Sequence, residues 1–262
     1  MQGMIGEGSG PYSGVATDMA GTPFASIAYV SETGSTNTDA AALLGNDRFA
    51  GRTLVAEYQS RGAGRKGRTW HAAPGTSLLF TTILPRAVAT ESLWLVPFWV
   101  ALAVRAALHE CGISTTLQWP NDLLLDERKI AGVLCQSRVT GPTARVACGV
   151  GINVHRTPGA AGIEPPPAFC DDVARFGRVL LLRAVLTRYA RALFMLDEPY
   201  TIIDRWDVAA RLPGRRYRLR LDNTAEVFEA TGQGLAEGGG LRVVRDDGGR
   251  AIVSLADARA LR

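Results

Sequence analysis

Lysine is the residue that this chain most conspicuously lacks. Only two of the 29 basic side chains in the 262-residue sequence are lysine, and the others are arginine. Lys66 lies in a stretch rich in glycine and arginine, and Lys129 opens an apolar, strand-like run. Lysine differs from arginine where a compact ammonium must meet a point of negative charge. Both lysines are therefore candidates for a chemical role. The alternative is that they are ordinary solvent-exposed residues that are lysine rather than arginine by chance.

Cysteine and histidine are also scarce, at four and three copies. No two cysteines have CxxC spacing, and no histidine has ligand spacing to another histidine or to a cysteine. The sequence therefore predicts reduced thiols that pack as small hydrophobic groups. It predicts no structural zinc, no other metal held by the protein, and no catalytic triad.

Long apolar runs and strong net charge are missing as well. The longest apolar run, residues 93–104, is too short to cross a bilayer, and no basic-plus-apolar leader opens the chain, so we expect a cytoplasmic protein with no membrane partner. A net charge of +4 suits anionic ligands but is too small for a nucleic-acid coat, so no DNA partner is expected. Residues 1–24 are rich in Gly, Ser and Thr and are predicted to be a disordered tail.

The remaining 238 positions divide into an α+β body over residues 25–211 and a small β-barrel over residues 212–262. Tight turns between residues 115 and 154 predict antiparallel hairpins. Strands are expected at residues 27–30, 53–59, 77–84, 115–119, 123–125, 130–139, 145–154, 217–221, 225–235, 241–246 and 251–255. Helices are expected at residues 39–44, 91–110, 171–196 and 199–212.

Residues 62–68 interleave three glycines with three cations. Glycines allow backbone N–H groups to turn toward a phosphate, and cations neutralise it. The stretch lacks the ending of a P-loop, so a phosphate or adenylate grip, a nucleic-acid patch and a flexible basic loop all remain open. Trp70 follows and offers a face for a base or another ring, unless it is simply a core aromatic.

Two further runs carry polar groups at strand ends. In the run 119–122, Asp122 could hold Mg²⁺ beside a triphosphate or orient Lys129, or the run could be an Asx-type turn. Lys129 heads a strand of small residues, a good position for bridging a carboxylate and a phosphate. Gly149 and Gly151 could admit a flat ring close to the backbone beside the Asn153 amide, and a β-bulge would explain them nearly as well.

Together these segments resemble the biotin–protein ligases, in the form without an N-terminal DNA-binding domain. Pieces of the family pattern occur in order over nearly all of the chain after residue 24. They are Gly34-Ser35-Thr36-Asn37, Ala56-Glu57-Tyr58-Gln59 with the Gly/Arg loop, Trp119-Pro120-Asn121-Asp122 to Lys129-Ile130-Ala131-Gly132, Gly149-Val150-Gly151-Ile152-Asn153, and the β-rich C-terminus.

The resemblance implies a catalytic domain related to class II aminoacyl-tRNA synthetases, followed by an SH3-like C-terminal domain. It implies that biotin and MgATP give biotinyl-5′-AMP, and that biotin then passes to one lysine of a biotin carboxyl carrier protein domain. We expect a monomer or a weak homodimer. The alternatives are a lipoate or other acyl ligase of the same fold, and a non-catalytic binder of carrier domains or nucleic acid.

The resemblance also implies roles for single residues. The catalytic group is Lys129, Arg65 and Asp122. Biotin would be held by Ser35, Thr36, Asn37, Gln59, Gly62, Ala63, Gly64, Arg65, Lys129 and Gly132. ATP would be held by Arg65, Arg68, Trp70, Asn121, Asp122 and Asn153. The chain departs from the family at Ala63, where an arginine is typical, and at Gln118, where a lysine is common.

Overall fold

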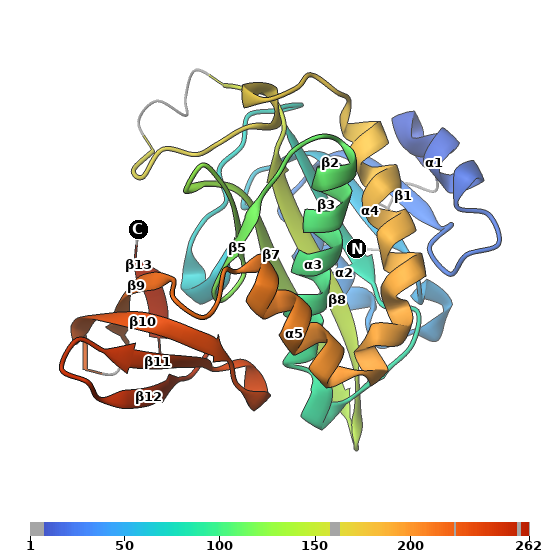
Figure 1. The fold of residues 1–262 in the computed structure, drawn as a ribbon. Coiled ribbons are helices and arrows are strands. Elements are labelled where there is room, and N and C mark those ends of the chain that lie inside the picture. Colours follow the sequence, from blue (N-terminus) through green and yellow to red (C-terminus); the bar gives the residue numbers. More distant parts are fainter. Residues whose placement is uncertain (1–7, 158–162, 223, 256–257, 262) are drawn as a thin grey trace.

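A computed structural model of the protein describes residues 8–157, 163–222, 224–255 and 258–261. The chain forms an eight-stranded sheet covered by helices and a separate five-stranded sheet beside it (Figure 1). The strands of the larger sheet run in the order β1-β2-β3-β8-β7-β6-β5, with β4 paired to β8. They are β1 (Ile27–Thr33), β2 (Thr53–Gln59), β3 (Ser77–Ile83), β4 (Val88–Ala89), β5 (Thr116–Gln118), β6 (Asp122–Leu125), β7 (Arg128–Thr140) and β8 (Thr143–Asn153).

The predicted antiparallel hairpins are confirmed. β5, β6, β7 and β8 pair antiparallel in sequence order. The turn from β6 to β7 places both Asp126 and Glu127 at positive φ, 47° and 60°, which is the geometry that suits the twist of a two-residue hairpin. Only β1 and β2 run parallel in the larger sheet.

Alternating side chains divide the larger sheet into two faces. Val55, Phe80 and Cys148 belong to the main hydrophobic core, whereas Leu54 and Ala147, one residue away, belong to a small second cluster with Ala40 and Leu44. Helix α2 (Thr36–Leu43) therefore covers one face. Helices α3 (Leu95–Glu110) and α4 (Arg178–Ala192) cover the other (Figure 1).

Two predicted helices begin later than expected. The helix predicted at residues 91–110 begins at Leu95, after a 3₁₀ turn, and ends before Gly112, whose φ is +82°. The helix predicted at residues 171–196 is regular only within α4. Its expected first turn is instead a 3₁₀ turn in which Asp172 binds basic side chains, so α4 begins after Gly177.

The five-stranded sheet is antiparallel, in the order β12-β11-β10-β9-β13, and is consistent with an SH3-like domain. β12 and β13 are its two edges, so the predicted barrel is not closed in the described residues. The last strand was not predicted, because its four residues are too few to give a recognisable pattern. The strands are β9 (Arg216–Leu221), β10 (Val227–Leu235), β11 (Leu241–Arg245), β12 (Arg250–Val253) and β13 (Ala258–Leu261).

The smaller sheet and the body share one continuous core, although the sequence suggested separate units. Helix α5 (Pro199–Ala209) lies between them, and its Trp206 packs edge-on against Phe98 at 4.7 Å. The buried Trp119 indole donates a hydrogen bond to the Gly239 carbonyl at 3.0 Å. The domain boundary at residue 212 stays a prediction.

The prediction of a disordered tail over residues 1–24 is wrong for residues 8–24. A 3₁₀ turn (Gly10–Tyr12) leads into α1 (Ser13–Asp18), and Tyr12, Val15, Met19 and Phe24 are buried in the main core. Tyr12, Val15 and Met19 recur at helical spacing, and Phe24 follows beyond the helix. All four pack on the body, an effect that the average composition of the segment conceals. Residues 1–7 lie outside the described residues.

Candidate active site

A cavity of about 340 Å³ lies against the larger sheet. Strands β2, β3, β7 and β8, the start of α2 and the Gly/Arg loop contribute to its wall. Of the residues predicted to bind ligand, all line this cavity except Gly62 and Asp122. The structure therefore brings together segments that are up to 118 residues apart, from Ser35 to Asn153.

One end of the cavity is formed by the start of α2. Ser35 precedes the helix, yet its side chain makes no capping hydrogen bond, and its buried Oγ has no partner in the structure. The buried Asn37 Oδ1 also has no partner, although Asn37 Nδ2 donates to the Leu134 carbonyl at 3.2 Å. An unsatisfied buried polar atom costs about 1–3 kcal/mol, so these two atoms favour a ligand that hydrogen-bonds with them.

Thr36 and Gln59 fix this end from two elements. The Gln59 Oε1 atom accepts from the Thr36 backbone N–H at 2.7 Å and from the Thr36 hydroxyl at 2.9 Å. The same hydroxyl lies 2.9 Å from the Thr81 hydroxyl of β3. Helix α2 is thereby held against β2 and β3, and the polar groups at its start are positioned before any ligand arrives.

The Gly/Arg loop is a short hairpin. Trp70 N–H donates to the Gly62 carbonyl at 2.8 Å, and Gly64 N–H donates to the Arg68 carbonyl at 2.7 Å. The backbone N–H of Gly64 is therefore used within the hairpin, contrary to the picture of glycines that turn their amides toward a phosphate. Gly62 supports Trp70 instead of lining the cavity, since a Cβ there would stand 2.5 Å from the Trp70 carbonyl oxygen.

Trp70 lies on glycines of the sheet. A Cβ on Gly151 would come within 2.7 Å of the indole ring, and one on Gly132 would come within 3.2 Å. The sequence suggested that a flat ring could approach Gly149 and Gly151, and the protein's own indole does so at Gly151. The bulge considered for these glycines is wrong, because β8 pairs in regular register with both neighbours.

A bulge does occur on β7, and it aims Lys129. Leu123 pairs with Ala131 and Leu124 pairs with Lys129, so Ile130 is an extra residue on its strand. The bulge lets Lys129 share a face with Gly132, whose added Cβ would lie 3.0 Å from Lys129 Nζ. The ammonium stands 5.3 Å from the Trp70 ring centroid and 2.7 Å from the Asp122 Oδ1 atom. Of the two predicted roles of Asp122, orienting Lys129 is the one that this geometry allows directly.

Arg65 extends from the hairpin toward two other parts of the molecule. Its guanidinium donates to the Leu255 carbonyl at 2.8 Å and reaches Asn121 Oδ1 at 3.4 Å. Burial is the largest cause of a lowered pKa for Arg65, and the nearby Arg68 acts in the same direction, whereas Asp122 and Asp222 oppose it. Asn121 is held in turn through its Nδ2, which donates to the Val133 carbonyl at 2.7 Å.

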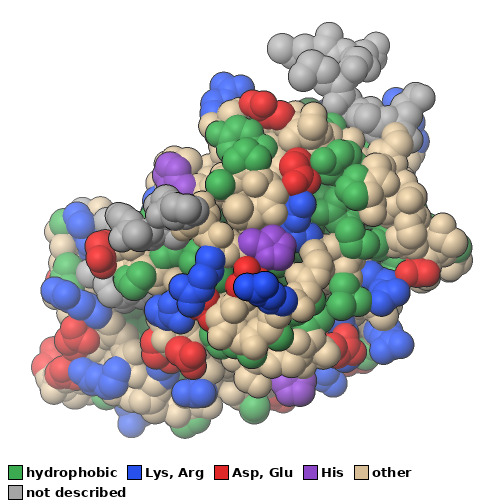
Figure 2. Space-filling model, turned by 90° about the horizontal axis from the view of Figure 1, so that it is seen from above, with side chains coloured by type: hydrophobic (Ala, Val, Ile, Leu, Met, Phe, Trp, Pro, Cys, Tyr) green, Lys and Arg blue, Asp and Glu red, His purple; other side chains and the backbone are tan. Residues whose placement is uncertain are grey.

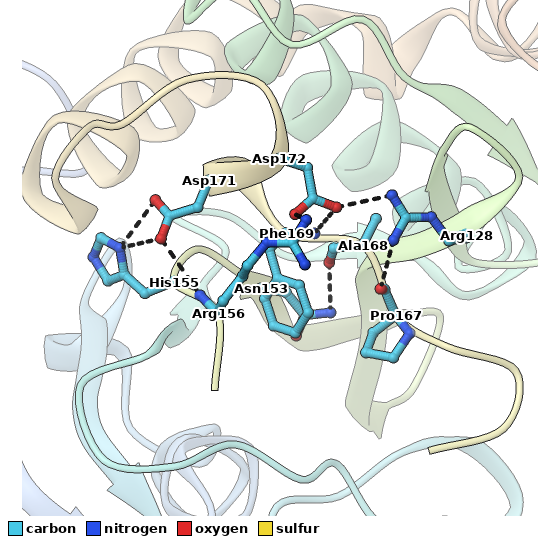
Figure 3. A network of polar contacts seen from close by, with 9 residues as sticks. All are labelled: Arg128, Asn153, His155, Arg156, Pro167, Ala168, Phe169, Asp171 and Asp172. Atoms are coloured by element: carbon cyan, nitrogen blue, oxygen red, sulfur yellow. Dashed lines mark hydrogen bonds and ion pairs between the residues drawn. The ribbon is translucent and has the colours of Figure 1, made fainter. Parts of the chain in front are cut away.

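Asn153 joins the cavity to a polar network that sequence reasoning missed (Figure 3). Its Nδ2 donates to the carbonyls of Ala168, at 3.1 Å, and Lys129, at 3.3 Å. The nearby Asp172 carboxylate pairs with Arg128 at 2.9 Å and with Arg156 at 2.7 Å. This network fixes the segment that supplies Ile163, Glu164, Pro165, Pro167 and Phe169 to the cavity wall.

Charges of both signs occur on the surface of the molecule. Figure 2 shows Lys and Arg side chains interspersed with Asp and Glu over the upper face of the molecule. Across the part of the chain that the structure describes, no group of three or more His, Cys, Asp or Glu side chains could hold a metal ion. No helix among the described residues combines the length and apolar character needed to cross a membrane.

Comparisons with known proteins agree on one family. Residues 30–153 match the profile of the Biotin/lipoate A/B protein ligase family. A biotin–[acetyl-CoA-carboxylase] ligase of Mycobacterium tuberculosis is 34% identical over 149 residues, which cover 53% of this chain and 53% of that protein. A bifunctional ligase/repressor BirA of Bacillus subtilis is 32% identical over 126 residues, which cover 47% of this chain and 39% of that protein. The chain thus matches only about half or less of these relatives.

The fold itself matches over a greater length. A biotin protein ligase from Aquifex aeolicus, solved in complex with biotin and ATP, superposes with a TM-score of 0.73 at 24% sequence identity. The superposition covers 90% of this chain and 99% of that one. At this identity the match establishes the fold, which confirms the predicted α+β class with a small C-terminal β-domain.

Proposed function

We propose that the chain, whose residues 30–153 match the profile of the Biotin/lipoate A/B protein ligase family, is an ATP-dependent biotin–protein ligase. It forms biotinyl-5′-AMP and pyrophosphate from biotin and ATP, and then transfers the biotinyl group to a lysine of a biotin carboxyl carrier protein domain with release of AMP. One observation carries the proposal: a single cavity joins buried, unpartnered polar atoms to a lysine and an arginine.

The α2 end fits the ring of biotin. That ring presents N–H donors and a carbonyl, and the unpartnered Ser35 Oγ and Asn37 Oδ1 atoms complement such groups. The start of a helix also favours the negative end of a dipole, here a ring carbonyl. A dithiolane ring, as in lipoate, has no N–H or carbonyl and would leave both oxygens unsatisfied. This difference favours biotin over the lipoate alternative.

The Lys129 end fits the chemistry of adenylation. A carboxylate and the α-phosphate of ATP repel one another, so cations must stand at both before in-line attack can occur. In the proposal, the Lys129 ammonium lies between the two anions, and Arg65 and Arg68 neutralise phosphate charge along the hairpin. Trp70, Asn121, Asp122 and Asn153 surround the nucleotide. No covalent bond to the enzyme is needed.

Mg²⁺ would accompany ATP. Asp122 offers a carboxylate and Asn121 an amide oxygen near this end, and Mg²⁺ is commonly held by one or two carboxylates together with substrate phosphates. Asp122 and Asn121 therefore fit a cation whose ligands come mainly from the triphosphate. The cation would neutralise negative charge on the phosphates.

The second step needs the acceptor amine to lose a proton. Asp122 is the carboxylate nearest to Lys129, but it already pairs with that ammonium at 2.7 Å, which weakens it as a general base. We therefore assign Asp122 chiefly to the orientation of Lys129.

The decisive experiment is ATP–pyrophosphate exchange with purified protein and labelled pyrophosphate. We expect exchange that depends on biotin and is at least tenfold weaker with lipoate. Transfer of labelled biotin to a purified carrier domain tests the second step. The assignment would be overturned by exchange that is equally fast without biotin, or by exchange that occurs with lipoate but not with biotin. A salt-sensitive complex with nucleic acid and no exchange would instead support the non-catalytic alternative.

A further inference from the structure

The tip of the Gly/Arg hairpin is in contact with the C-terminal sheet, and the proposed chemistry does not use that contact. Lys66 forms an ion pair with Asp222, which directly follows β9. One residue earlier, Arg65 donates to the Leu255 carbonyl at 2.8 Å, just beyond β12. Two consecutive hairpin residues are thus tied to two separate segments of the smaller sheet.

The backbone of the tip is shaped for this contact. Lys66 has φ 56° and ψ 40°, and Gly67 has φ 73°, so two successive residues lie in the left-handed region. A bulky non-glycine residue rarely adopts this conformation, and it persists where surrounding contacts hold it. Lys66 does not line the cavity, whereas Arg65 and Arg68 on either side do. The tip therefore directs Lys66 only to the C-terminal sheet, whereas Arg65 contacts that sheet and also lines the cavity with Arg68.

Charge gives a reason for the pair. The hairpin carries Arg65, Lys66 and Arg68 within four residues, and their mutual repulsion opposes a compact tip. The Asp222 carboxylate pairs with Lys66 at this tip, and Asp222 directly follows β9 of the C-terminal sheet. Both side chains are about a third exposed, at 27% for Lys66 and 33% for Asp222, so the pair works as a positional tie more than as a source of stability.

We propose that Lys66 and Asp222 are positioning residues: through this pair the C-terminal sheet holds the hairpin, with Arg65, over the cavity and slows escape of the acyl-adenylate. The proposal rests on the proposed function for its last clause only. The pair touches no reacting atom. It acts through the hairpin, whose Arg65 and Arg68 face the ligand.

Reversed charges test the tie without any catalytic assay. Lys66→Asp, Asp222→Lys and the double exchange are compared by limited trypsin digestion of the hairpin, scored at Arg61, Arg65 and Arg68, which every variant keeps. Aspartate tolerates the left-handed conformation at position 66. Each single reversal should speed cleavage about fivefold, and the double exchange should restore the slow rate. Equal rates in all four proteins would overturn the tie.

The matched control is Asp246→Asn. Asp246 forms a two-point ion pair with Arg216 in the same sheet, at 2.6 and 2.9 Å, and makes no contact with the hairpin. Its loss should leave hairpin cleavage unchanged. Melting temperatures of every variant identify general unfolding, and a variant that melts early is replaced by Asp222→Asn, which keeps the size of the side chain.

Retention is then measured on the same proteins loaded with labelled biotin and ATP. Single reversals should release biotinyl-adenylate about fivefold faster, biotinylate bystander proteins more, and change the KM for biotin less than the release rate. The double exchange should reverse these effects. If wild-type protein makes no adenylate, the proposed function fails while the digestion result still decides the tie. Unchanged release in variants with a loosened hairpin would overturn the retention role.

Discussion

The two ends of the cavity are built differently. At the α2 end, Thr36 and Gln59 are locked together by hydrogen bonds between a helix and adjacent strands of one sheet. At the Lys129 end, the groups come from a hairpin, a strand bulge, the segment before α4 and the second sheet. The contrast indicates that the polar groups at the α2 end are preformed, whereas the groups at the Lys129 end depend on contacts between distant parts of the chain.

The largest effect should come from Lys129→Arg at the assembled end. A planar fork cannot replace an ammonium that stands 2.7 Å from Asp122 and against Gly132, so ATP–pyrophosphate exchange should fall by about 10²–10³-fold. Arg86→Lys, which keeps a charge in the surface pair with Asp197, is the control and should exchange normally. Near-normal turnover of the Lys129→Arg variant would contradict the proposed role of Lys129.

The preformed end is tested by Asn37→Ala. The change removes the unpartnered Oδ1 atom and the bond to Leu134, so the KM for biotin should rise about tenfold with little change in the KM for ATP. Thr38→Ala, at an exposed position on the same helix, should leave both constants unchanged. A rise confined to the KM for ATP would contradict the division between the two ends.

Gly151→Ala probes the seat of Trp70. The added methyl group would stand 2.7 Å from the indole, which must shift and disturb the ring beside Lys129. We expect the KM for ATP to rise about fivefold, measured by initial rates. Gly177→Ala, where an added Cβ meets nothing within 4 Å, serves as the control. An unchanged KM would mean that the ring position does not matter for the nucleotide.

The smallest effect concerns the support behind the preformed end. Arg178 donates two hydrogen bonds to Glu57, at 2.8 and 3.0 Å, and these are the main cause of the lowered pKa of Glu57. The Arg178–Glu57 pair therefore stabilises the folded state fully above the pKa that Glu57 has in the unfolded chain. This stabilisation is lost as the pH falls through the lower pKa that Glu57 has in the folded protein. Urea unfolding should show Glu57→Gln less stable by about 0.5 kcal/mol at pH 7, with the difference vanishing in acid. A difference that persists in strong acid would contradict the ion-pair explanation.

Much of the preformed end could be predicted from local sequence. Ser35, Thr36 and Gln59 lie in short runs whose types and order carry the family pattern, and hairpin signals placed β5 to β8 in the right pairing. The comparisons with known proteins support the proposed function, whereas the role of each residue stays a prediction that the experiments above address.

The features that could not be predicted from the sequence depend on contacts between distant segments. Tyr12 and Val15 look like part of a polar tail until the body that buries them is present. The pairing of Arg128 with Asp172 spans 44 residues, and that of Lys66 with Asp222 spans 156. Neither pair has a local sequence pattern, so the sequence could not show which group Lys66 contacts.

Because Ile130 is an extra residue in β7, the direction of the Lys129 side chain depends on the number of residues in this strand. Side chains alternate across a strand, so loss of one residue before Ala131 would remove the bulge and turn Lys129 toward the core face. Substitutions at Ile130 that keep a bulky apolar group preserve the count and should be mild. Between related chains, a single-residue gap at this place would therefore be more damaging than most replacements, and alignments should treat the spacing from Asp122 to Gly132 as fixed.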